Sequence, residues 1–149
     1  MQMSRRKKVH DKNQKKKMLI VEDKAINRYV LRGIFEGEYD IAECQDGRAA
    51  IEFLGESRDE VVAVLLDIVM PVCDGFAVLK YMKETSLYNV PVILISSNMN
   101  ESNIHKVSVY DIVVDYIQKP FQENIVRQRV QKAIELYQKK ENIKYERAE

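Results

Sequence analysis

Short apolar runs alternate with helix-period segments along the chain. The apolar runs lie at residues 18–21, 39–44, 61–66, 92–95 and 112–117 and predict strands. Apolar positions recur every three or four residues in the segments between these runs and after the last one. This spacing predicts helices over residues 26–35, 49–54, 76–83, 103–110 and 121–137. Five strands alternating with five helices indicate an α/β sandwich built on a parallel sheet.

The individual patterns also predict positions within that sheet. Residues 61–66 are apolar throughout, as expected of a central parallel strand that is buried on both faces. Residues 39–44 alternate instead and suit an edge strand. The helix over 49–54 is expected to end at Gly55, and the helix over 103–110 has a poor apolar stripe. Two core-facing stripes complete the expected core, one of Ile26, Val30, Leu31, Ile34 and Phe35, the other of Ile125, Val126, Val130, Ala133, Ile134 and Tyr137.

The composition indicates a soluble globular domain, with 46% hydrophobic and 32% charged residues among 149. The six-residue run at 61–66 is far shorter than the roughly 20 apolar residues that a membrane helix needs. Only the run at 18–21 follows the basic start before Glu22 and Asp23, which is too short for a signal peptide. We therefore expect a cytoplasmic protein without a membrane segment.

The net charge of +1 conceals an uneven distribution. Residues 1–17 contain eight Lys and Arg against one Asp, and the remainder contains sixteen against twenty-two acidic residues. We predict that residues 1–17 form a disordered basic arm or linker and that residues 139–149 form a charged tail or linker. The folded domain between them is predicted at 18–138, and we expect no direct nucleic-acid binding by it.

Polar residues follow the predicted strands at the end where parallel sheets bind ligands. Glu22 and Asp23 follow the first strand, and Asp67 follows the third. Ser96 ends the fourth strand, and Lys119 follows the fifth. Three carboxylates, a hydroxyl and an ammonium should therefore meet at one edge of the sheet.

This set of groups suits phosphoryl transfer onto a carboxylate. Crowded carboxylates resist ionisation unless a cation lies among them, and hard oxygen ligands favour Mg²⁺ or Mn²⁺. A lysine can neutralise the remaining phosphoryl charge, and a serine hydroxyl can donate one more hydrogen bond. Asp67, at the end of the central strand, is the predicted nucleophile.

Four short motifs now support a resemblance. They are "VEDKAINR" at 21–28, "LLDIVMPVCDG" at 65–75, "PVILISS" at 91–97 and "DYIQKPF" at 115–121. In this order and spacing they resemble the receiver domain of response regulators in bacterial two-component systems, over residues 18–138. The resemblance implies a flavodoxin-like, doubly wound five-stranded parallel sheet of order 2-1-3-4-5.

The resemblance also assigns roles to residues. Asp67 would be the phosphoacceptor, with Ser96 and Lys119 contacting the phosphoryl group. The metal would be held by Glu22, Asp23, Asp67 and the backbone carbonyl of Val69. A cis peptide before Pro120 would direct Lys119 into the site, and Gly75 would allow a tight turn into the following helix. Tyr116 falls at the position of the family's switch aromatic, which moves inward when Ser96 moves.

The resemblance also implies partners: the phosphoryl donor would be a histidine kinase or a phosphotransfer protein. The domain would catalyse only its own phosphorylation and dephosphorylation and would not act as an enzyme on other substrates. Phosphorylation would change partner binding or promote a homodimer through the fourth helix, fifth strand and fifth helix. The chain has no output domain, so we expect a fragment of a longer regulator, with a stand-alone receiver as the alternative.

Two other functional classes remain open from the residues alone. An aspartyl-nucleophile hydrolase or transferase would need a substrate pocket and lid, for which no segment of the chain is long enough. A non-phosphorylated interaction module of the same fold would not need every one of these site positions to be filled.

Overall fold

The computed structural model describes residues 15–70 and 73–148 of the chain. Strands and helices alternate as predicted: β1 (Lys17–Val21), α2 (Ala25–Phe35), β2 (Asp40–Cys44), α3 (Gly47–Ser57), β3 (Val61–Leu66), α4 (Gly75–Glu84), β4 (Val92–Ser96), α5 (Glu101–Val107), β5 (Val113–Gln118) and α6 (Glu123–Ala148). A 3₁₀ turn, η1 (Arg58–Glu60), precedes β3. The predicted arm lies almost wholly outside the described residues, and Pro71 of the second motif also lies outside them.

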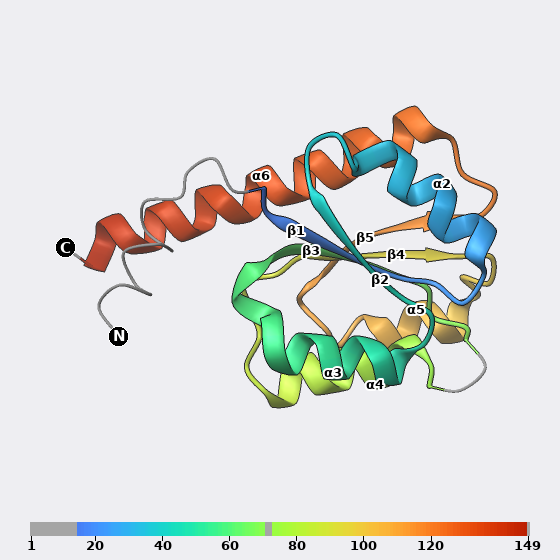
Figure 1. Cartoon of the computed structure of the whole chain (residues 1–149). Helices are drawn as coiled ribbons and strands as arrows, with labels where there is room; N and C mark the ends of the chain where they lie inside the picture. Colours follow the sequence, from blue (N-terminus) through green and yellow to red (C-terminus); the bar gives the residue numbers. More distant parts are fainter. Residues whose placement is uncertain (1–14, 71–72, 149) are drawn as a thin grey trace.

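The five strands form one parallel sheet in the order β2-β1-β3-β4-β5, which confirms the expected doubly wound order. Strand β2 lies at one edge, and β3 is central and buried at five of its six positions. Helices α2 and α6 cover one face of the sheet and α3, α4 and α5 the other (Figure 1). None of the helices in the described residues has the length and apolar character needed to span a bilayer.

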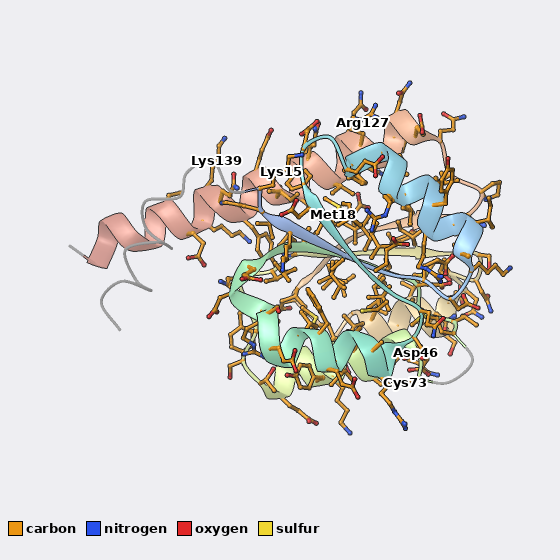
Figure 2. All side chains as sticks on the ribbon, viewed as in Figure 1. Lys15, Met18, Asp46, Cys73, Arg127 and Lys139 are labelled. Atoms are coloured by element: carbon orange, nitrogen blue, oxygen red, sulfur yellow. The ribbon has the colours of Figure 1, made fainter. Side chains whose placement is uncertain are left out.

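Two separate cores result from the alternation of side chains along the strands. In β1, Met18 and Ile20 pack with α2 and α6, whereas Leu19 and Val21 pack towards α3 and α4. Figure 2 shows side chains filling the space between the sheet and both helical layers. Because both faces of β1 are covered, the strand is apolar at consecutive positions.

Helices α3 and α5 differ from the predictions at both ends. Helix α3 starts at Gly47, because the Asp46 carboxylate caps it by accepting a hydrogen bond from Ala49 N at 2.8 Å, and it continues through Gly55. Helix α5 starts earlier and ends earlier than predicted, since Asn100 is its N-cap. At the start of each helix a local capping group outweighed the apolar spacing.

The two predicted core stripes each contain one exposed residue. Ile26 is 66% exposed and Ile125 is 42% exposed, so neither belongs to the core. Both lie in the first turn of their helix.

Helix α6 is longer than the stripe predicted. It passes the proposed boundary at residue 138, ends at Ala148, and extends beyond the edge of the sheet in Figure 1. The side chain of Lys139 stands exposed on this extension (Figure 2). The domain limits at 17/18 and 138/139 stay predictions.

Candidate functional site

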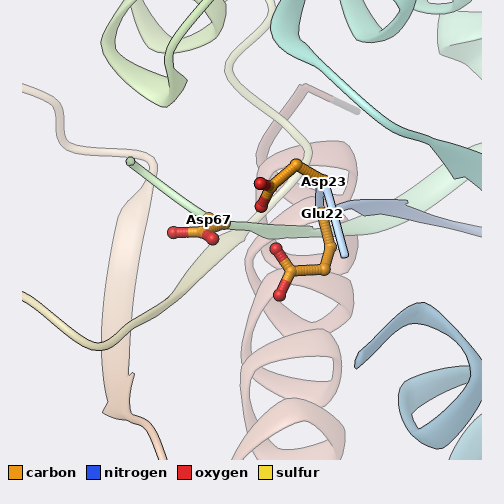
Figure 3. Close-up of side chains that lie close together, drawn as sticks. All are labelled: Glu22, Asp23 and Asp67. Atoms are coloured by element: carbon orange, nitrogen blue, oxygen red, sulfur yellow. The ribbon is translucent and has the colours of Figure 1, made fainter. Parts of the chain in front are cut away.

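The acidic residues meet because β1 and β3 are neighbours. Val21 pairs with Leu66 in the sheet, and the Asp67 N–H donates to Val21 O at 3.0 Å. The residues that follow each strand therefore emerge side by side. One carboxylate oxygen from each of Glu22, Asp23 and Asp67 lies within 4.8 Å of the others (Figure 3).

Lys119 reaches this cluster from the end of β5, which lies on the other side of β3 from β1 in the sheet. The Lys119–Pro120 peptide is cis, as the resemblance implied, and Lys119 N donates to Ser96 O at 3.0 Å. Its ammonium Nζ contacts Glu22 Oε1 and lies 3.1 Å from Asp67 Oδ2. Burial lowers the pKa of Lys119, but the hydrogen bonds and charges of the two carboxylates outweigh it and raise the pKa above its ordinary value. Lys119 therefore stays an ammonium at neutral pH.

The Asp67 carboxylate is held in a defined orientation. It is 6% exposed, and its Oδ1 accepts a hydrogen bond from the Val69 N–H at 3.1 Å. Oδ2 faces Lys119. The two oxygens are thus differently occupied, which orients the predicted nucleophile.

Gly75 supports Asp67 through a close approach of the two main-chain segments. Its φ is not positive. A Cβ at this position would lie 2.6 Å from Asp67 O and 2.8 Å from Ile68 Cα. The Gly75 N–H also donates to Ile68 O at 2.8 Å. Only glycine lets the start of α4 pack this tightly against the segment that carries the acceptor.

Ser96 and Tyr116 occupy different environments. Ser96 is fully buried at the end of β4, and its Oγ accepts a hydrogen bond from the Asn98 N–H at 3.2 Å. Tyr116 is 46% exposed on β5. In this structure, then, the tyrosine side chain stands outward and Ser96 is hydrogen-bonded within its own loop.

A surface pocket of about 830 Å³ opens at the carboxyl ends of the strands. It gives Asp67 access to an incoming group. Its lining combines acidic, basic and apolar side chains: Asp23, Lys24, Asn27, Val30, Asp67, Val69, Met70, Ser97, Lys119, Pro120 and Phe121.

The site suits a hard divalent cation. Glu22 is 2% exposed, and its Oε2 is the one buried side-chain oxygen or nitrogen within residues 15–70 and 73–148 that has no hydrogen-bond partner. A buried carboxylate oxygen without a partner is costly, and a bound cation or its water shell would satisfy it. Three carboxylates at this separation fit Mg²⁺ by donor type.

Two residues at this site escaped the sequence analysis. Asn27 Nδ2 donates to Glu22 Oε1 at 2.5 Å, and Arg28 Nη1 donates to the backbone carbonyls of Glu22 and Asp23 at 2.8 and 3.1 Å. Both lie in the second half of "VEDKAINR". Helical periodicity could have located them, because the first turn of a helix that follows the acidic pair must fold back over it.

Comparison with known proteins gives consistent results. A family model described as the response regulator receiver domain matches residues 18–131. The chemotaxis protein CheY of Halobacterium salinarum is 35% identical over 72% of this chain and 88% of that protein. In the crystal structure of the CheX–CheY–BeF3–Mg²⁺ complex from Borrelia burgdorferi, one chain is 28% identical and superposes with a TM-score of 0.72, over 81% of this chain and 90% of that one.

A third relative is much longer than this chain. The protein-glutamate methylesterase/protein-glutamine glutaminase of Caldanaerobacter subterraneus is 36% identical over 70% of this chain. The chain spans about a third of the length of such relatives, 28% here and 37% in the protein of the same description from Methanococcoides burtonii. The likeness therefore concerns one part of these proteins.

Proposed function

The chain belongs to the response regulator receiver family, a family of signalling domains, and we propose that Asp67 is its phosphoacceptor. The observation that carries the proposal is the meeting of three carboxylates and the Lys119 ammonium beside an open pocket, which Asp23, Asp67 and Lys119 line. This arrangement combines a nucleophilic oxygen with the positive charge that a phosphoryl group requires.

We infer the following chemistry. An oxygen of Asp67 attacks the phosphorus of the donor, a new P–O bond forms, and the bond to the donor breaks with its electron pair kept by the donor. Lys119, 3.1 Å from Asp67 Oδ2, neutralises charge on the phosphoryl oxygens. Ser96 turns its hydroxyl from the Asn98 N–H towards the phosphoryl group.

Mg²⁺, or Mn²⁺ in its place, would be held by Glu22, Asp23, Asp67 and the carbonyl of Val69. When bound, the ion supplies charge neutralisation of phosphoryl oxygens in the transition state. The chemotaxis protein from Borrelia burgdorferi was crystallised with BeF3 and Mg²⁺, which supports the same assignment for this chain.

The phosphoryl donor that we propose is a histidine kinase or a phosphotransfer protein in the cytoplasm. The domain catalyses only its own phosphorylation and dephosphorylation. The methylesterase description of one relative is not carried over, because the chain matches only 28% of that protein. We propose that the output is provided by a separate domain or partner.

The signal would leave through the face formed by α5, β5 and α6. Exposed apolar side chains on these three consecutive elements support an interaction surface, and a homodimer is the partner we propose. Tyr116 would move inward into the space that Ser96 leaves. The exposed apolar residues of these elements include Ile104, Val114, Tyr116 and Ile125, each 39% to 46% exposed.

Acetyl phosphate with Mg²⁺ tests the acceptor directly. Intact mass should show one added phosphoryl group in the wild type and in Asp40→Asn, a matched control at the exposed start of β2. Asp67→Asn should show none, and EDTA should abolish the addition to the wild type. Labelling of Asp67→Asn at another carboxylate would overturn the assignment.

A further inference from the structure

Asn27 is joined to the acidic cluster by one short hydrogen bond. It is the third residue of α2, its side chain lines the pocket, and its Nδ2 lies 2.5 Å from Glu22 Oε1. Lys119 contacts the same oxygen. Two donors thus converge on Oε1, while Glu22 Oε2 has no partner within the described residues.

This asymmetry has a physical consequence for Glu22. A glutamate has one more rotatable bond than an aspartate, so its carboxylate is harder to hold in one orientation. A lysine alone is a point charge that can pair with either oxygen of a carboxylate. The amide of Asn27 adds a directional hydrogen bond to Oε1 and thereby distinguishes the two oxygens.

The neighbouring Arg28 holds the backbone of the same segment. Its Nη1 donates to the carbonyls of Glu22 and Asp23, and its Nε lies 3.4 Å from Glu43 Oε1. The Glu22 N–H in turn donates to Cys44 O at 3.0 Å. The main chain of the acidic pair is therefore already fixed, so the contact from Asn27 acts on the side chain of Glu22 specifically.

We infer that Asn27 is a positioning residue for divalent-cation binding, because it directs Glu22 Oε1 to itself and Lys119 and leaves Oε2 available to the cation or its water shell. The inference rests on the proposed function. Loss of a hydrogen-bonding partner behind a metal ligand commonly weakens metal affinity by about ten- to a hundredfold. Asn27→Ala should therefore weaken Mg²⁺ binding by about tenfold.

A double-mutant cycle tests this route. The Mg²⁺ dissociation constant is measured from amide chemical shifts, without any phosphoryl donor, for the wild type, Asn27→Ala, Glu22→Gln and the double variant. If Asn27 acts through Glu22, the double variant should bind Mg²⁺ as Glu22→Gln does, with no further loss. Asn89→Ala is the matched control, since Asn89 is exposed and lines pockets at the opposite end of the sheet.

The possible failures are distinct. A wild-type protein that does not bind Mg²⁺ would overturn the proposed metal role together with this inference. Wild-type affinity in Asn27→Ala, while Asp67→Asn binds Mg²⁺ weakly, would overturn the inference alone. Losses in Asn27→Ala and Glu22→Gln that multiply in the double variant would show that Asn27 acts independently of Glu22, which also contradicts it.

Discussion

Gly75→Ala should destabilise the protein and displace the acceptor segment. The added Cβ would lie 2.6 Å from Asp67 O, where ordinary contact begins at 3.4 Å, so the backbones must separate by about 0.8 Å. This atom and the next nearest, Ile68 Cα at 2.8 Å, belong to the main chain, which cannot rotate away as a side chain can. Overpacking of this kind costs about 1–3 kcal/mol. For a chain of this size the melting temperature should fall by about 2–12 °C.

The same displacement should slow phosphorylation. A shift approaching 1 Å at a reacting group commonly costs up to about a hundredfold in rate, so Gly75→Ala should be labelled by acetyl phosphate about ten- to a hundredfold more slowly. Differential scanning calorimetry gives the stability, and intact mass against time gives the rate.

Gly33→Ala supplies a control with the opposite sign. Gly33 lies exposed in α2, and its added Cβ would meet no described atom within 4 Å. Because alanine favours a helix over glycine, this variant should gain about 0.5–1 kcal/mol and keep the wild-type labelling rate. Wild-type stability and rate in Gly75→Ala would refute the view that this glycine is required for close packing against Asp67.

Three further predictions follow from other regions. Beryllofluoride is expected to protect the amides at 96–110 of the wild type from hydrogen exchange. Tyr116→Ala should lose this protection and still be phosphorylated. Equal protection in both proteins would show that the tyrosine is not the switch. Burial, with a smaller contribution from the charge of Asp46, raises the pKa of the Cys44 thiol from 9.0 to about 11. At pH 8 iodoacetamide should therefore modify Cys73 and should modify Cys44 only after urea has unfolded the protein. Between about pH 9 and 11 the Cys44 thiol keeps its proton in the folded state and loses it in the unfolded state, so the free energy of unfolding should fall as the pH rises through this range. Cys44→Ala should reduce that fall. Asp46→Ala should cost about 1 kcal/mol in urea denaturation by removing the cap of α3, and no change in the urea midpoint would contradict the capping role.

Much of the fold was predictable because the pattern of apolar and polar residues in each strand is a local property of the sequence. The run at 61–66 is apolar throughout because β3 is central, and the alternation at 39–44 matches an edge strand. Helix ends were less predictable, since α3 continues through Gly55 once Asp46 has started it. A glycine inside a helix costs less than the packing of that helix contributes.

The sequence by itself placed the charged groups of the site at one end of the sheet. In a parallel sheet the carboxyl ends of all strands lie at one edge, so Glu22, Asp23, Asp67 and Lys119 were expected to gather there once the strands were identified, and the structure brings these four together. The tertiary structure alone decided how these side chains pair. Lys119 lies 97 residues from Glu22 in sequence, and Asn27 turns back onto the same carboxylate oxygen. Such pairings depend on ångström-scale distances and on side-chain rotamers, which follow from the packing of whole elements and leave no periodic trace in the chain.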